Sequence, residues 1–210
     1  MSDKQTAAAR LAAAWLLSYP DDTLLGRLDS IAAVVAELPP STGAPLSLFL
    51  AHLSDTPLSD VQAHYVTVFD MKRKACPYLT YWTDGDTRNR GRAILRFKQA
   101  YLEAGYDLGS EELPDHLSVV LEFAAIADTL TGEALLSEHQ DAIHLLRDAL
   151  AKMESAYVHV LDAVMATLPH ITPEIAERMA QLAASGPPVE QVGLEPFPTA
   201  PTLIEIGARR

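Results

Sequence analysis

The feature that most constrains the fold is a run of large apolar residues at helical spacing near residue 160. The run consists of Met153, Tyr157, Val160, Leu161, Val164 and Leu168. Spacings of three and four residues place these side chains on one face of an α-helix, and Pro169 ends the run. Ala and Leu dominate the remaining chain, while β-branched residues are sparse. We therefore predict an all-α protein without a strand ladder or an internal repeat.

Weaker stripes of the same kind predict a single helical-bundle domain of about eight or nine helices over residues 1–186. The expected helices cover about residues 3–18, 22–38, 46–53, 57–70, 86–104, 114–124, 131–150, 153–168 and 172–184. Prolines predict a loop at 39–43 and irregular structure at 75–84. Gly105 is placed to end the helix before it, and 106–113 is expected to be a loop.

The C-terminal residues 187–210 differ in composition from the rest. They contain Pro187, Pro188, Pro196, Pro198 and Pro201, which favour an extended tail. The apolar segment 203–206 within the tail is suited to dock on this chain or on another.

The charge distribution indicates which kinds of partner the protein can bind. The net charge of −12 argues against general nucleic-acid binding. Residues 70–98 hold eight basic and three acidic residues, a charge of +5, so the remainder of the chain carries −17. An acidic field of this kind attracts basic partners, although a merely solubilising surface is the alternative.

The N-terminal residues bear on localisation. Residues 1–5 lead directly into an Ala-rich amphipathic segment, without the basic and apolar regions of a signal peptide. The apolar runs are shorter than the ~20 residues that span a bilayer. We expect a cytoplasmic protein with no membrane span.

Motifs for catalysis are absent from the sequence. It has no G-x-S-x-G, no phosphate-binding glycine loop and no dinucleotide fingerprint. A di-iron site needs paired acid–histidine motifs, whereas Asp141-x-x-His144 occurs once. The single cysteine, Cys76, is either a packing residue or a nucleophile beside a histidine. We predict a non-enzyme; the alternatives are a small metal- or haem-binding enzyme using Cys76, His116 and His144, or a helical adaptor for another client.

Residues 69–123 contain choices that helix packing does not explain. The motifs in and beside this stretch are Tyr65-x-x-x-Phe69-Asp70, Tyr78-Leu79-Thr80-Tyr81, Gly85-Asp86-Thr87-Arg88-x-Arg90-Gly91, Lys98-Gln99-Ala100-Tyr101 with Gly105, Glu112-Leu113-Pro114-Asp115-His116-Leu117, and Val120-Leu121-Glu122-Phe123-Ala124. Over about 60 residues their order and spacing resemble the TorD/DmsD-like redox enzyme maturation proteins, most nearly the NarJ-type nitrate reductase assembly chaperones. Residues 1–57 and 130–210 add only length and helical character.

The resemblance implies a chaperone that assembles a molybdenum-containing enzyme. Its partner would be the nitrate reductase α (catalytic) subunit, bound through an N-terminal, signal-like helix in the cytoplasm. The chaperone would keep this client competent for insertion of bis-molybdopterin guanine dinucleotide and delay its docking on the membrane partner. It would bind no cofactor stably itself, and molybdenum cofactor biosynthesis proteins are a further implied partner.

An apolar groove is expected to hold the client helix. Its predicted lining is Tyr65, Phe69, Tyr78, Leu79, Tyr81 and Trp82. Asp115, expected in the first turn of a helix, is predicted to pair with the peptide, and His116 to make binding pH-dependent.

Each of these residues has a structural alternative. Tyr65 and Phe69 also suit a core stripe, and Asp115 also suits a helix cap. The polar set Asp86, Arg88, Arg90 and Arg92 is predicted to contact the client or the phosphates of the cofactor. A solvated helix face is the alternative for this set.

Overall fold

The computed structural model describes residues 1–109 and 112–188 of the chain. Within these ranges it has twelve α-helices, a π-helical turn at Val66–Asp70, a 3₁₀ turn at Arg73–Ala75 and no β-strand. The helices are α1 Asp3–Leu16, α2 Asp22–Leu25, α3 Leu28–Ala36, α4 Pro40–Asp55, α5 Leu58–Tyr65, α6 Leu79–Asp84, α7 Arg88–Glu103, α8 Leu117–Ile126, α9 Thr129–Glu138, α10 Gln140–Lys152, α11 Tyr157–Met165 and α12 Pro173–Ser185. The predicted all-α class is confirmed. The predicted tail falls almost wholly outside the described residues.

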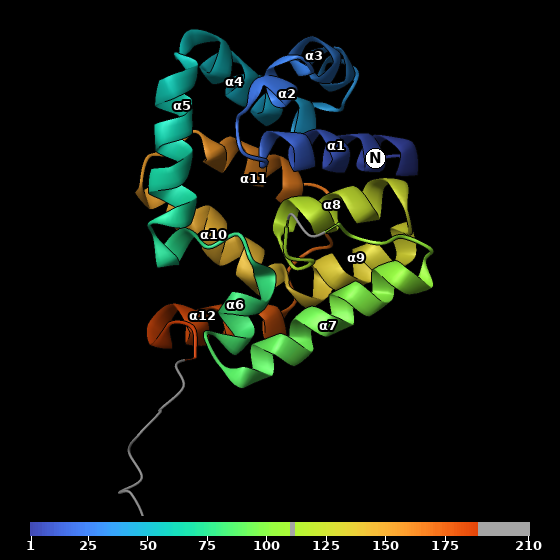
Figure 1. The fold of residues 1–210 in the computed structure, drawn as a ribbon, viewed down its shortest axis with the longest axis vertical. Coiled ribbons are helices and arrows are strands. Elements are labelled where there is room, and N and C mark those ends of the chain that lie inside the picture. Colours follow the sequence, from blue (N-terminus) through green and yellow to red (C-terminus); the bar gives the residue numbers. More distant parts are fainter. Residues whose placement is uncertain (110–111, 189–210) are drawn as a thin grey trace, which may run out of the picture.

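The helices stack around a continuous apolar core. Helix α1 packs along α8, α8 packs on α9, and α4 packs on α11. In Figure 1, α2, α3 and α4 lie at one end of the molecule, α6, α7 and α12 lie at the other, and α5 runs along one side between them. Small residues of α1, including Ala9 and Ala13, are buried and permit close approach to α8.

The apolar stripes of the sequence form this core as predicted. Tyr157, Val160, Leu161 and Val164 of α11 are each at most 1% exposed.

Ser2 begins α1 with a capping box, because its hydroxyl accepts from the Gln5 N–H while its own N–H donates to the Gln5 side chain.

Helices outnumber the nine expected because two expected helices are divided and because α6 forms in the stretch 75–84 that was expected to be irregular. The stretch 22–38 forms α2 and α3, with a break at Gly26–Arg27. The stretch from 129 to 152 forms α9 and α10, because His139 adopts a non-helical backbone between them.

The predicted loop at 39–43 is wrong, since α4 begins at Pro40. Proline is tolerated there because the first N–H groups of a helix have no partner within the helix. The Pro39 carbonyl accepts from the N–H groups of Thr42 (3.0 Å) and Gly43 (2.7 Å), which starts the helix.

Gly132 allows α9 to approach α8 closely. It is buried in α9, and a Cβ atom added to it would overlap Ala124 of α8. We expect Gly132→Ala to lower the free energy of unfolding by about 1–3 kcal/mol through overpacking. Urea denaturation measures the change.

Gly91→Ala is the matched control. Gly91 lies on the exposed face of α7 with nothing near its missing Cβ. Alanine there should stabilise the protein by about 0.5–1 kcal/mol, because glycine weakens a helix interior. Equal effects at the two positions would contradict the close α8–α9 contact.

Candidate functional site

Residues 77–79 and 115–117, which are distant in sequence, pair with each other within the stretch 69–123. The Leu79 N–H donates to the Asp115 carbonyl, and the Leu117 N–H donates to the Pro77 carbonyl, both at 3.0 Å. This pairing forms an isolated antiparallel bridge between Tyr78 and His116. Because α6 and α8 follow directly, their N-terminal ends are held beside each other.

Asp115 caps α6 from across the bridge. Its Oδ2 accepts from the Thr80 N–H at 3.2 Å and from the Thr80 hydroxyl. Thr80 lies in the first turn of α6, where N–H groups lack helical partners. The side chain is 0% exposed, and its Oδ1 has no hydrogen-bond partner.

Two predictions about these segments are wrong. Asp115 precedes its own helix, which begins at Leu117 and is capped by His116 Nδ1 accepting from the Ser118 N–H at 3.3 Å. Residues 79–84 are helical rather than irregular, because the cap that satisfies their first turn comes from Asp115. The sequence around 79–84 alone contains no sign of this cap.

Tyr78 and Arg90 form the outer part of the cluster. The Tyr78 ring stands edge-on to His116 with centroids 5.1 Å apart, and its hydroxyl donates to Glu112 at 3.0 Å. Burial, followed by the charge of Glu112, raises the pKa of Tyr78, so the phenol stays protonated. The Arg90 guanidinium lies 5.6 Å from the Tyr78 ring centre, a cation–π distance.

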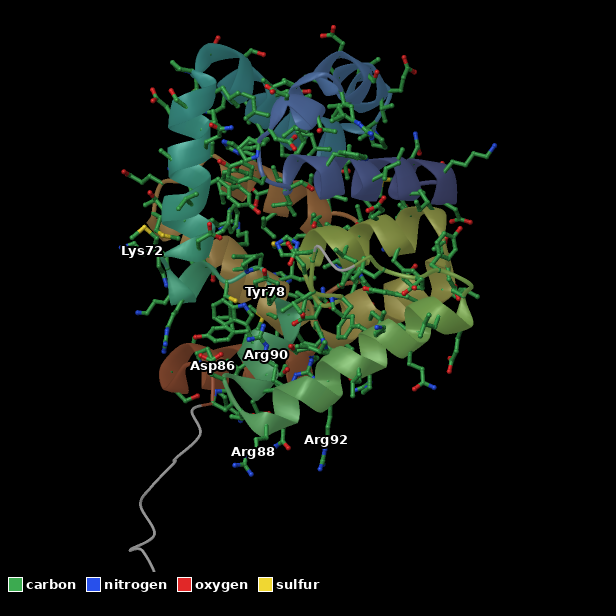
Figure 2. All side chains as sticks on the ribbon, in the orientation of Figure 1. Lys72, Tyr78, Asp86, Arg88, Arg90 and Arg92 are labelled. Atoms are coloured by element: carbon green, nitrogen blue, oxygen red, sulfur yellow. The ribbon has the colours of Figure 1, made fainter. Side chains whose placement is uncertain are left out.

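The predicted polar set divides between this cluster and the surface (Figure 2). Arg90 Nη1 lies 3.5 Å from Asp86 Oδ1, so both residues belong to the edge of the cluster. Arg88 and Arg92 are exposed and point away from the body of the molecule in Figure 2.

The predicted groove residues are mostly core in this structure. Seven of the eight predicted peptide-binding residues are buried: Tyr65, Phe69, Leu79, Tyr81, Trp82, Asp115 and His116. Tyr65 and Phe69 pack against Tyr157, with ring centroids 5.9 and 4.9 Å away, and Tyr65 donates to the Leu17 carbonyl. Tyr78 is half-buried. Peptide binding by this set stays a prediction, and it requires these side chains to move.

The enzyme alternative receives no support from the described residues. Burial raises the pKa of Cys76 to about 11, so its thiol is protonated and a poor nucleophile at neutral pH. Asp141 is paired with Arg178 at 3.1 Å. Among residues 1–109 and 112–188, no three His, Cys, Asp or Glu side chains are placed to hold a metal ion together.

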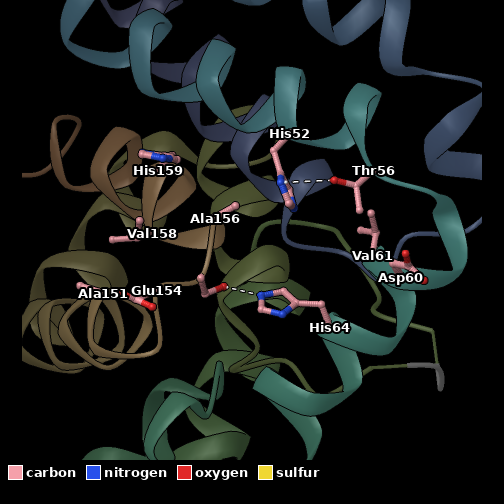
Figure 3. A pocket seen from close by; sticks show the side chains of 11 residues that line it. His52, Thr56, Asp60, Val61, His64, Ala151, Glu154, Ala156, Val158 and His159 are labelled. Carbon is pink, nitrogen blue, oxygen red and sulfur yellow. Dashed lines mark hydrogen bonds between the residues drawn. The ribbon is translucent and has the colours of Figure 1, made fainter.

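A pocket of about 510 Å³ that the sequence did not predict lies between the end of α4, α5 and the α10–α11 turn (Figure 3). His52, His64 and His159 line it. His64 Nε2 lies 2.8 Å from the Ser155 hydroxyl, and burial followed by the nearby His52 lowers the pKa of His64. These histidines come from three separate segments, so no local spacing could have grouped them.

The helices within residues 1–109 and 112–188 are each short or polar compared with what a bilayer span needs. None combines the length and the apolarity that crossing a bilayer requires.

Asp115→Ala tests the cap. The Thr80 N–H would lose its acceptor in a buried position, so we expect the free energy of unfolding to fall by about 1–3 kcal/mol. Asp115→Asn keeps a side-chain carbonyl acceptor and should lose less. Chemical denaturation compares the three proteins, and an alanine variant of unchanged stability would contradict the capping role.

Buried histidines predict acid sensitivity. Burial lowers the pKa of His116 and of His139, so the folded state favours the neutral rings and the unfolded chain binds protons at higher pH. The full stability is present above about pH 6.5 and is lost as the pH falls toward the lowered values. The free energy of unfolding, measured across this range, should therefore decrease with acid.

His139→Phe should flatten part of that decrease. Neither ring nitrogen of His139 has a hydrogen-bond partner, and the ring packs on Phe97 at 5.2 Å, which an apolar ring preserves. We expect stability at neutral pH to be unchanged or higher. An unchanged pH slope would contradict the contribution of His139.

The paired segments lie within the part of the chain that is similar to known proteins. Residues 35–163 match the family model described as nitrate reductase delta subunit, and this range includes the paired segments. The chain is 38% identical over 155 residues to the nitrate reductase-like protein NarX of Mycobacterium tuberculosis (strain ATCC 25618 / H37Rv). That match covers 72% of this chain but 23% of NarX, so the chain spans about a quarter of that longer relative.

Two further similarities cover most of this chain and most of the protein compared with it. The nitrate reductase molybdenum cofactor assembly chaperone NarJ of Escherichia coli (strain K12) is 30% identical over 178 residues, covering 82% of this chain and 75% of NarJ. A crystal structure of a protein from Archaeoglobus fulgidus, assigned as a redox enzyme maturation protein, superposes with a TM-score of 0.58 at 23% identity, covering 76% and 91% of the two chains. The structural likeness supports the fold alone. On the family model and the NarJ similarity, the chain belongs to the nitrate reductase delta subunit family, in its NarJ-type branch of assembly chaperones.

Proposed function

We propose that this protein is an assembly chaperone for a nitrate reductase catalytic subunit and that it binds the N-terminal, signal-like helix of that client. In the cytoplasm it holds the client competent for insertion of bis-molybdopterin guanine dinucleotide, before the client docks on its membrane partner. The cofactor is cargo for the client. The name of the NarJ relative supports the assembly role and agrees with a chain that has no catalytic activity of its own.

The observation that carries peptide recognition is the Asp115 carboxylate. It is fully buried, yet Oδ1 has no hydrogen-bond partner. Buried carboxylate oxygens are normally satisfied, so this atom marks an unfilled position for a donor. The half-buried Tyr78 lies at the outer side, on His116, and its contact with Glu112 is exchangeable with solvent.

Recognition then follows from charge and shape. Movement of Tyr78 would open a path to Asp115, and a basic side chain of the client would supply the missing donor. The apolar face of the client helix would take the place of the side chains displaced around Tyr81 and Trp82. The acidic excess outside residues 70–98 favours the approach of such a basic peptide.

The arginine-bearing face of α7 has a separate proposed role. Arg88 and Arg92 are exposed at the same end of the molecule as α6 and α12 (Figure 2). Guanidinium groups pair with phosphates and carboxylates in a bidentate way. This face would contact the folded part of the client or the phosphates of the incoming cofactor, with molybdenum cofactor biosynthesis proteins as the donors.

Calorimetric titration tests the peptide proposal. The ligand is a peptide of the first ~15 residues of the nitrate reductase catalytic subunit, about four helical turns. We expect one-to-one binding with a Kd in the micromolar range or tighter, at about pH 6 and about pH 8 on either side of the histidine range. No heat and no displacement of a fluorescent peptide would contradict the proposal.

Tyr78→Ala locates the site. We expect a Kd about tenfold higher, since aromatic anchors carry much of the binding energy at interfaces. Tyr106→Ala is the matched control, because Tyr106 is a 45% exposed tyrosine beyond the C-terminal end of α7, whereas Arg90, which lies beside Tyr78, is in the first turn of that helix. Equal losses for both variants would place the peptide elsewhere.

A further inference from the structure

Helix α12 lies on the surface of the domain without entering its core. None of its residues is buried. Ile175, Met179 and Leu182 are half-buried at spacings of four and three residues, so they form one shallow apolar stripe. Helix α12 packs against α10.

One ion pair fixes α12 on this surface. Arg178 Nε lies 3.1 Å from Asp141 Oδ2, and the Asp141 side chain is 2% exposed while that of Arg178 is 49% exposed. Asp141 Oδ1 accepts from the Ala142 N–H at 2.9 Å. A buried carboxylate needs a cation or several donors, and here a half-exposed arginine on a shallow helix supplies the charge.

Beside Arg178 lies a pocket of about 220 Å³ with both polar and apolar side chains in its lining. Thr83 and Asp84 of α6, Glu138 of α9 and His139 line it together with Arg178. His139 is 6% exposed, and neither of its ring nitrogens has a partner. The pocket therefore contains unfilled hydrogen-bonding capacity next to a buried acid.

This pocket and the Asp115 cluster share α6. Asp115 caps the first turn of α6, and the last residues of α6 line the pocket. A six-residue helix is about 9 Å long, so a client helix of ~15 residues, about 22 Å, is long enough to reach both.

We propose that α12 occupies a helix-binding site on α10 and is exchanged there for the client helix, with Arg178 standing in for a basic side chain of the client on Asp141. This inference rests on the proposed function and deepens it by naming the second contact and its regulation. The occupant is an amphipathic helix with an arginine or lysine beside its apolar stripe, which is the chemistry that α12 itself presents. His139 then hydrogen-bonds to a polar group of the bound helix.

If α12 competes with the client helix, releasing α12 should make the client peptide bind more tightly. In the full chain, Arg178→Glu places a like charge at Asp141 and removes the tether, and it alters no core side chain because none of the residues of α12 is itself buried. The ~15-residue client peptide should bind at least about threefold more tightly, since less of the protein has the site occupied. Lys4→Gln, at an exposed position, removes one positive charge without touching α12 and should leave the Kd unchanged.

Asp141→Asn is the second variant, and hydrogen exchange is the second measurement. In the Arg178→Glu background, where α12 is already released, loss of the acid should weaken client-peptide binding about tenfold. Saturating client peptide should accelerate amide exchange of residues 173–185 in the unaltered protein. Bound peptide with unchanged exchange in 173–185 and an unchanged Kd in Arg178→Glu would overturn the inference while leaving the proposed function standing.

A synthetic peptide of residues 171–186 separates the two proposals. It should bind Arg178→Glu, whose site is vacant, and bind the unaltered protein less well. If it binds in this way and the client peptide binds neither protein, the helix site is supported and the proposed client is wrong. If it fails to bind Arg178→Glu, the helix site is overturned.

Discussion

The pairing of residues 77–79 with residues 115–117 is the interaction on which the rest of the functional region depends. Two backbone hydrogen bonds and the Asp115 cap join the start of α6 to the start of α8. Because α8 packs on α1 and α9, and six of its ten residues are buried, the short α6 is anchored to the core of the fold. The position of Tyr78, the contacts of Arg90 and the lining of the pocket at Thr83 all follow from this anchoring.

Much of the fold could be predicted because its signals are local. The stripe around residue 160, the start of α12 after Thr172 and the end of α7 before Gly105 follow from spacing, capping residues and a positive φ. The helical state of 79–84 could not be predicted, because its cap lies 35 residues away. The start of α4 at Pro40 was missed because proline is a helix breaker in the interior and a good first residue.

The sequence predicted which residues lie together at the site better than it predicted whether they are buried. The sequence motifs pointed to Tyr78, Asp115 and His116, and the structure brings these three together. Tyr65 and Phe69 lie instead on Tyr157, a pairing across about 90 positions that spacing cannot reveal. On the proposed function, a cluster rich in donors and acceptors has the burial of a core because the residues proposed to recognise a client are covered when no client is bound.

The trans cap also has a consequence for the order in which the chain folds. A helix of six residues is too short to persist alone, since nucleation of the first turn is unfavourable and few bonds follow it. α6 therefore forms after Asp115 has been brought to Thr80, a closure that costs chain entropy. The helix beside the proposed client contacts is thus among the last to acquire its structure, and pulling Asp115 away would melt it first while the helices of the core remain.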